Sequence, residues 1–298
     1  MGSYGKFEKN TFLYCLHTTV IQGGLTMSLH NEWISFSQNG QDGRLYLSRP
    51  AHVERPLPAV IVIQEIWGTD RHIRELTDRI AMAGYLAVAP DLYAENGVRS
   101  EMMGEERIDR VKDFLDSVPP QAWGDEALRN QELEKLPAPE RNELKETLGT
   151  LFGGLGRFPQ LVQTLKATVD FLQGYQYSAG ERIASVGFCM GGALSALLAC
   201  EEPRLAGAVI YYGNLPGREQ AEKIQCPVAG FFGGLDHRIT NQVPGFVESM
   251  KELDKHFKYE IYEEAHHAFF NDTRASYNVD AARDAWVKTL QFFKKVLA

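Results

Sequence analysis

One short segment, residues 187–192, combines a cysteine with three glycines in the order Gly-Phe-Cys-Met-Gly-Gly. It follows an apolar, β-rich run and precedes a helical pattern, so it matches the nucleophile elbow Gly-x-Ser-x-Gly with Cys189 in place of serine. In such a tight turn the nucleophile is strained, and glycines leave room where other side chains would clash. A helix N-terminus favours an anion, and the thiolate is the reactive form of cysteine. We therefore predict that Cys189 is a catalytic nucleophile; a buried structural cysteine is the alternative.

Asp236 and His267 are the candidate acid and base. Each follows a β-rich run through a short loop, which predicts that both lie at the carboxyl ends of strands. The order Cys189, Asp236, His267 is the nucleophile, acid, histidine order that accompanies such an elbow. We expect Asp236 to fix the imidazole tautomer and His267 to exchange protons with the sulfur and the leaving group. His237 and His266 are rivals because each adjoins a favoured residue.

The elements that must position these residues form a regular alternation from residue 43 onward. Apolar, β-branched runs typical of strands buried on both faces alternate with amphipathic helical patterns. This alternation indicates an α/β fold with a mostly parallel, doubly wound sheet. We expect strands at 43–48, 59–64, 85–89, 182–186, 206–211, 226–232 and 258–262, and helices at 73–83, 161–172, 190–200 and 282–297.

The stretch 94–158 interrupts this alternation. It is acidic on balance and helical in pattern, and we expect no strand in it. About sixty residues is far longer than a normal connection between a strand and a helix. Two interpretations stay open. The stretch is either a helical insertion without a catalytic role, or a lid over a site at the carboxyl ends of the strands.

Composition places this chain of 298 residues among ordinary globular proteins, since it is 44% hydrophobic and 23% charged. Its net charge of −8 leaves no basic surplus to neutralise phosphates, so we expect no nucleic-acid partner. The cysteines at 15, 189, 200 and 226 are too few for a disulfide scaffold and lack zinc-site spacing. We therefore expect a cytoplasmic protein with no metal and no other cofactor.

We expect residues 1–26 to be a leader or extension outside the fold, and residues 27–298 to form a single domain. The apolar part of the leader, 11–17, is short and no cleavage site follows it, which disfavours a secretory signal. No run approaches the roughly 18 apolar residues that span a bilayer, so we expect no membrane partner. A monomer and a homodimer both remain open.

Three blocks together resemble the dienelactone hydrolase family of α/β-hydrolases. They are Gln64-Glu-Ile-Trp-Gly68, the elbow at 187–192, and Asp236 with His267-Ala-Phe269; the segment 90–93 also matches. A cysteine elbow together with a glutamate just past the first buried strand is uncommon in other hydrolases of this fold. The resemblance covers the chain from about residue 40 onward and implies an α/β-hydrolase fold with a helical insertion.

The resemblance also implies further site residues. Glu65 would interact with the nucleophilic cysteine and help to form the thiolate when substrate arrives. The backbone N–H groups of Ile66 and Met190 would form the oxyanion hole, which agrees with the rule that the residue after the nucleophile supplies one donor. For Glu65, a purely structural ion pair with Arg71 or Arg74 is the alternative.

The substrate pocket departs from the family pattern at one position. Family members that act on dienelactone carry an arginine four residues beyond the catalytic histidine, where this chain has Asn271. Asparagine cannot replace a bidentate clamp on a carboxylate, although Arg274 or Arg99 could substitute. We expect substrate contacts from Asn271 and from aromatic loop residues, namely Trp67, Phe188 and Phe269, with Phe270 beside them.

The leading functional hypothesis is a cysteine-dependent hydrolase of activated carboxylic esters or lactones, of the dienelactone or enol-lactone type, acting through a thiol ester. A broad-specificity carboxylesterase or thioesterase is the second hypothesis. A non-catalytic binding protein of the same fold is the third. Metal-dependent hydrolysis is disfavoured because His266 and His267 are adjacent, so their side chains diverge, and the chain lacks a zinc-protease motif.

Overall fold

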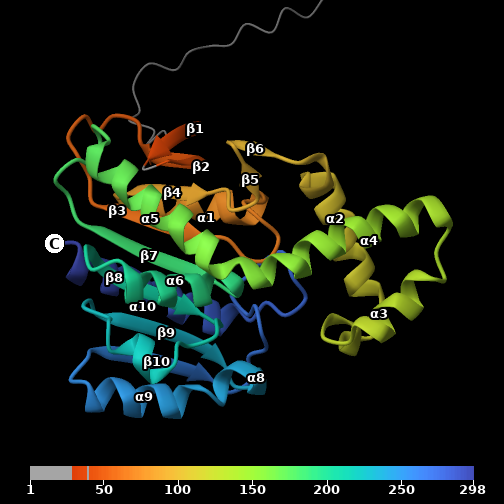
Figure 1. Ribbon diagram of the computed structural model, residues 1–298. Coiled ribbons are helices and arrows are strands. Elements are labelled where there is room, and N and C mark those ends of the chain that lie inside the picture. The colour runs from red at the N-terminus through yellow and green to blue at the C-terminus, as the bar shows by residue number, and fades with distance from the viewer. Residues whose placement is uncertain (1–28, 39) are drawn as a thin grey trace, which may run out of the picture.

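The central element of this computed structural model, which describes residues 29–38 and 40–298, is an eight-stranded sheet (Figure 1). The strands lie in the order β1-β2-β4-β3-β7-β8-β9-β10. Strand β2 pairs antiparallel with β1 and β4, and the other pairs are parallel. The expected leader at 1–26 and the first residues of the expected domain lie outside the described residues.

The strands are β1 (Leu29–Gln38), β2 (Gln41–Pro50), β3 (Ala59–Ile63), β4 (Leu86–Pro90), β7 (Ile183–Phe188), β8 (Leu205–Tyr211), β9 (Val228–Gly233) and β10 (Phe257–Tyr262). The helices around them are α1 (Arg71–Met82), α5 (Phe158–Gly174), α6 (Met190–Glu201), α7 (Arg218–Ala221), α8 (His237–Thr240), α9 (Val243–Glu252) and α10 (Val279–Val296).

Helices cover both faces of the sheet, and this explains the continuous apolar runs. In β3, Ile61 and Ile63 pack in one core with α5, α6 and α9. Val60 and Val62, which point to the opposite face, pack in a second core with α1 and α10. Because neither face of β3 meets solvent, every position of the strand is buried and apolar.

Strand β1 is a long strand that was not expected from the residue pattern. It lies at the edge of the sheet and pairs only with β2. Ile34 and Phe36 pack against the core, whereas Trp33 on the other face is 36% exposed. An edge strand with one solvated face has a mixed polar pattern that is weaker than the signal of a buried strand.

The expectation that 94–158 contains no strand is wrong. Strands β5 (Ala94–Glu95) and β6 (Val98–Arg99) form a small antiparallel pair. The turn between them is Asn96-Gly97, with φ of 51° and 76°. Asn-Gly is a strong signal for a two-residue hairpin because both turn positions need a positive φ. That signal was present in the sequence.

Helices form most of the rest of this stretch, which confirms the helical insertion. They are the short 3-10 helices η1 (Glu101–Met103), η2 (Pro120–Trp123) and η3 (Gly154–Arg157), and the helices α2 (Glu105–Ser117), α3 (Glu126–Leu133) and α4 (Ala138–Gly153). Figure 1 shows α2, α3 and α4 beside the end of the sheet rather than on either face. Their apolar residues form a third core, which also contains Ile66 and Trp67 from the loop after β3.

Candidate active site

Cys189 occupies a strained turn between β7 and α6. Its φ is 54° and its ψ is −115°, a conformation that few residues other than glycine adopt. The neighbouring glycines make this turn possible. A Cβ on Gly187 would lie 1.8 Å from the carbonyl oxygen of Gly191, and a Cβ on Gly191 would lie 2.3 Å from that of Ile63. The packing of strand, turn and helix therefore requires glycine at both positions.

Two other residues near this turn also have a positive φ. Tyr212, which follows β8, has a φ of 38°, and Ala268, next to the candidate histidine, has a φ of 60°. Cys189 is only partly buried and precedes the first residue of α6, so its sulfur lies at a helix N-terminus, where negative charge is favoured. Strained backbone is common at catalytic sites because the surrounding structure holds the reacting groups in place.

His267 and Asp236 form the acid and histidine pair that the sequence predicts. Nδ1 of His267 lies 2.5 Å from Oδ2 of Asp236, whose side chain is 8% exposed. The pKa of His267 is raised to about 10. Burial alone would lower this pKa, but the charge of Cys189, together with hydrogen bonds to Asp236 and Cys189, favours the protonated imidazole more strongly. The three residues therefore lie within one interacting group.

The rival histidines lie differently. His266 and His237 are both exposed, and neither shares a hydrogen bond with Asp236 or Cys189 in the described part of the chain. His237 is the first residue of α8. Of the three histidines, His267 is the one whose ring meets the acid.

Glu65 is buried, with 2% exposure, and two neutral donors hold its carboxyl group. The Tyr212 hydroxyl donates to Oε1 at 3.1 Å, and the Asn271 amide donates to Oε2 at 2.6 Å. Burial raises the pKa of Tyr212 well above its usual range, so this hydroxyl stays protonated and can donate. The arrangement joins three loops at the carboxyl ends of strands.

In the part of the chain that the structure describes, Glu65 forms no ion pair with Arg71, Arg74 or another arginine. Arg71 pairs with Glu75 along the exposed face of α1. Arg74 pairs with Glu105 of α2 and also donates to the backbone carbonyl of Thr69. Glu65 instead relies on hydrogen bonds from uncharged side chains.

Tyr93 contacts both residues that are expected to supply the oxyanion donors, Ile66 in the loop after β3 and Met190 at the start of α6. The Tyr93 hydroxyl donates to the carbonyl of Ile66 at 2.8 Å and lies 3.9 Å from Sδ of Met190. Burial, and then the charge of Cys189, raise the pKa of Tyr93. Within the described residues, the N–H groups of Ile66 and Met190 have no hydrogen-bond acceptor, so both are available to a ligand.

Three of the expected substrate contacts are not supported by their positions. Phe188 and Phe269 are 1% and 0% exposed and belong to the core between the sheet, α1 and α10. The Asn271 side chain, 1% exposed, is directed to Glu65, and its oxygen accepts hydrogen bonds from Thr273. Buried side chains with complete packing or hydrogen bonding have no surface for a substrate. The apolar character of these aromatic residues instead stabilises the sheet beneath the site.

Trp67 differs, because it connects the site to the insertion. Its ring meets that of Trp123 edge to face, with 5.5 Å between centroids. The Arg274 guanidinium lies 5.4 Å from the Trp67 ring and forms an ion pair of 2.5 Å with Asp116 of α2. Trp67 itself is 4% exposed, so the insertion covers most of it.

Neither candidate replacement for the family arginine is free to bind a carboxylate. Arg274 is paired with Asp116. Arg99 donates to both carboxylate oxygens of Asp91 at 2.8–3.2 Å, and the Asp91 side chain is 1% exposed. Each guanidinium is therefore already neutralised within the protein.

Tyr212 and Tyr93 are site residues that the sequence analysis did not assign. Both follow predicted strands at their carboxyl ends, the edge of the sheet where ligands bind in this kind of fold. Tyr93 also belongs to the 90–93 segment. Their position after a strand was a usable signal, whereas their hydrogen bonds to Glu65 and Ile66 depend on the tertiary structure.

In the described residues, no group of three or more histidine, cysteine, aspartate or glutamate side chains could hold a metal ion. A search of the helices in the same residues found none long and apolar enough to cross a membrane.

The cysteine elbow, the histidine and acid that follow it, and the mostly parallel sheet define an enzyme of the α/β-hydrolase fold. The chain belongs to the dienelactone hydrolase family, whose family model matches residues 44–297. The fold and the family resemblance drawn from the sequence are thus confirmed, and the chain is a carboxylic ester hydrolase.

Relatives cover nearly the whole chain. A protein of Saccharolobus solfataricus is 34% identical over 267 residues, which are 88% of this chain and 98% of that protein. One of Escherichia coli O157:H7 is 30% identical over 275 residues, 88% of this chain and 85% of that protein. Both bear the name "Putative carboxymethylenebutenolidase". A Klebsiella pneumoniae crystal structure described as "Putative Dienelactone Hydrolase" has a TM-score of 0.67 and 28% identity, covering 90% of this chain and 99% of that one.

Proposed function

We propose that the enzyme hydrolyses activated carboxylic esters or lactones through a thiol-ester intermediate on Cys189. The observation that carries this proposal is that Cys189, in its strained turn, interacts with His267, whose Nδ1 lies 2.5 Å from Oδ2 of Asp236. A raised imidazole pKa beside a thiol favours the pair of imidazolium and thiolate, which is the reactive state of a cysteine nucleophile. Because the chain belongs to a family of ester hydrolases, a purely binding role is disfavoured.

In the first half of the reaction, the Cys189 sulfur attacks the carbonyl carbon. A carbon–sulfur bond forms and the carbonyl electron pair moves to oxygen, which the Ile66 and Met190 amides stabilise. When this intermediate collapses, the bond between carbon and the leaving oxygen breaks, and His267 gives that oxygen its proton. In a lactone, the leaving oxygen stays attached to the same molecule as an enol.

In the second half, water attacks the thiol ester. His267 takes a proton from water while the new carbon–oxygen bond forms, and the carbon–sulfur bond then breaks. The products are the free acid and the restored pair of imidazolium and thiolate. Asp236 stabilises the protonated imidazole and fixes its orientation throughout.

We assign Glu65 the role of helping to generate the thiolate when substrate arrives, as the family resemblance implies. Its position supports this role, because Tyr212, which holds its carboxyl group, also interacts electrostatically with Cys189. The neutral partners Tyr212 and Asn271 hold Glu65 in place without neutralising it by a paired cation.

The substrate class follows from leaving-group chemistry and local charge. A thiolate is a better leaving group than a simple alkoxide, so enol esters and enol lactones, whose leaving groups are stabilised enolates, fit a cysteine enzyme best. A buried Glu65 without a paired cation, together with Arg274 and Arg99 already paired, disfavours a substrate carboxylate close to the reacting carbon. We therefore propose a preference for uncharged activated esters and lactones, with a broad carboxylesterase as the second candidate.

The test is hydrolysis of cis- or trans-dienelactone beside p-nitrophenyl acetate by the wild type, Cys189→Ala and Cys200→Ala. We expect the uncharged ester to be the better substrate, and we expect Cys189→Ala alone to lose both activities. Cys200 is the matched control because burial raises its thiol pKa to about 12. Efficient turnover of the charged lactone would overturn the proposed preference, and full activity of Cys189→Ala would overturn the mechanism.

A further inference from the structure

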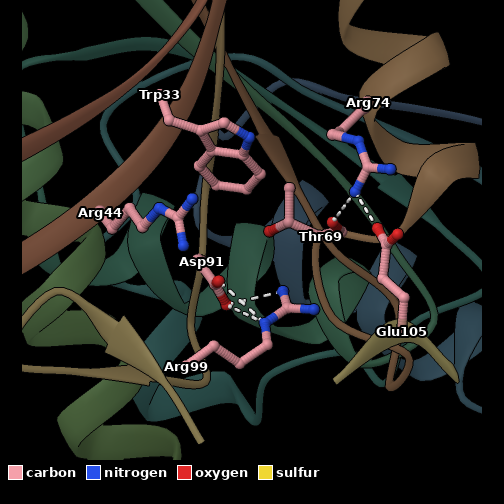
Figure 2. Close-up of a pocket in the computed structure, with 7 residues that line it drawn as sticks. All are labelled: Trp33, Arg44, Thr69, Arg74, Asp91, Arg99 and Glu105. Atoms are coloured by element: carbon pink, nitrogen blue, oxygen red, sulfur yellow. Dashed lines mark hydrogen bonds and ion pairs between the residues drawn. The ribbon is translucent and has the colours of Figure 1, made fainter. Parts of the chain in front are cut away.

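A cavity of about 360 Å³ lies beside the first strands of the sheet, and it is not the catalytic centre. Figure 2 shows the side chains around it, which come from β1, β2, β6, the loops after β3 and β4, and the first turns of α1 and α2. None of Cys189, Asp236 and His267 lines it. Three of its lining residues are arginines, namely Arg44, Arg74 and Arg99.

Two of these arginines have carboxylate partners. Arg99 binds Asp91 through two of its nitrogens, and Arg74 pairs with Glu105 (Figure 2). Both carboxylates also line the cavity. With Arg44 included, three positive side chains face two negative ones, so the wall of the cavity carries one excess positive charge.

Arg44 is the source of this excess. Its guanidinium lies over the Trp33 ring, 4.1 Å from the ring centroid, and the side chain is half-buried. Among the described residues it has no hydrogen-bond acceptor and no carboxylate within ion-pair distance. A guanidinium has five N–H donors, and stacking on an indole leaves all of them available in the plane of the group.

We propose that this cavity binds a small organic monoanion, specifically a carboxylate that carries a flat apolar part. One carboxylate balances the single excess charge and matches the planar fork of Arg44 with two parallel hydrogen bonds. Stacking on Trp33 already restricts the Arg44 side chain, which reduces the entropy lost on binding. The 36% exposed indole offers the apolar surface for the flat part of the ligand.

The test is isothermal titration of the full chain with benzoate and with benzamide, its uncharged analogue of the same shape. We expect one benzoate to bind per chain and benzamide to bind roughly tenfold more weakly or not at all. Arg44→Gln should weaken benzoate binding by a similar factor. Arg71→Gln, which removes an 84% exposed arginine away from the cavity, should bind benzoate like the wild type.

Unchanged hydrolysis of p-nitrophenyl acetate by Arg44→Gln checks that the variant folds. Arg44→Lys keeps the charge without the planar fork, so intermediate affinity is expected and the variant replaces Arg44→Gln if that protein does not fold. Equal affinity for benzamide, benzoate binding that survives Arg44→Gln, or no saturable binding by the wild type would each overturn the proposal. Competitive inhibition of ester hydrolysis by benzoate would also overturn it, because it would place the ligand at the catalytic centre.

Discussion

At the level of single residues, the two carboxyl groups near Cys189, those of Asp236 and Glu65, have different hydrogen-bond partners. We expect this difference to give them different roles. Asp236 meets the His267 ring, whose positive charge it stabilises. Among the described residues, the side chains that donate to Glu65 are those of the neutral Tyr212 and Asn271. When two carboxyl groups of one site have different surroundings, they commonly have different roles in the reaction. In the proposed mechanism, Asp236 would support the base, while Glu65 would act on the nucleophile.

Asn271→Ala tests whether Asn271 positions Glu65 rather than the substrate. Removing the donor leaves one oxygen of a buried carboxyl group without its partner, which should cost about 1–3 kcal/mol of unfolding free energy. We expect kcat to fall with little change in KM, since the side chain has no surface for substrate. Steady-state kinetics and urea unfolding measure both effects, with the exposed Asn214→Ala as control. A rise in KM at constant kcat would indicate a direct substrate contact.

The raised pKa of His267 also predicts how stability depends on pH. A group whose pKa is higher in the folded state binds its proton more tightly there. The contribution of His267 to stability is therefore full below its usual pKa of 6.5 and is lost as pH rises through about 10. The difference in unfolding free energy between the wild type and His267→Gln should shrink across this window.

Urea unfolding at several pH values measures this difference, and His266→Gln, which removes an exposed neighbouring imidazole, is the matched control. A difference that grows between pH 6.5 and 10 would mean that the folded protein disfavours the imidazolium. Such a result would count against a stable pair of imidazolium and thiolate.

At the scale of elements, the elbow depends on the close approach of β7, α6 and the end of β3. A methyl group on Gly191 would lie 2.3 Å from a backbone oxygen of Ile63, and backbone cannot move aside as a flexible side chain can. Gly191→Ala should therefore lower the unfolding free energy by about 3 kcal/mol or more and strongly reduce kcat. Gly217→Ala is the control, because a Cβ there meets nothing within 4 Å. Equal stability of the two variants would show that the elbow tolerates displacement.

Buried elements were the easiest to predict. The run 59–64 became β3, and 190–200 became α6, because burial on all sides requires apolar residues throughout. Strand β1 was missed because one of its faces meets solvent, and the β5 and β6 pair was missed although Asn96-Gly97 signals its turn.

Site residues could be predicted where their position directly after a strand placed them at one edge of the sheet. Cys189, Asp236 and His267 each follow a strand, so the sheet brings them together. The partners of Glu65 were not predictable, since Tyr212 and Asn271 come from loops far apart in the sequence. Phe188 was misassigned because an aromatic residue near a nucleophile has the same sequence signature whether it points to the core or to the substrate.

At the scale of the whole molecule, the insertion shares its core with the loop that carries Glu65 and Ile66. Ile66 and Trp67 pack among the apolar residues of α2 and α4. Lys112 of α2 also pairs with Asp70 at the end of the same loop, at 2.9 Å. The insertion thus supports the expected oxyanion donor from outside the sheet, which gives it a role whether or not it moves as a lid.

Trp123→Ala tests this support. Loss of its ring contact with Trp67 should shift the loop and reduce kcat/KM by roughly tenfold. Leu136→Ala, in the same apolar cluster but without a ring contact to Trp67, is the control. Both side chains are partly buried, so both variants should lose about 2 kcal/mol or more of stability, measured by thermal unfolding, but only Trp123→Ala should lose activity. Equal loss of activity in both would point to general loosening of the insertion.

In the proposed mechanism, Cys189 forms a covalent thiol ester during turnover. The most direct measurement is mass spectrometry of the enzyme quenched in acid within the first turnovers of p-nitrophenyl acetate, followed by peptide mapping. We predict one acetyl group per chain, located on Cys189, and no adduct in Cys189→Ala. The buried Cys226, whose thiol pKa is raised to about 11 by burial, should remain unmodified. An acetyl group on another residue during full turnover, or hydrolysis by Cys189→Ala at the wild-type rate, would contradict the mechanism.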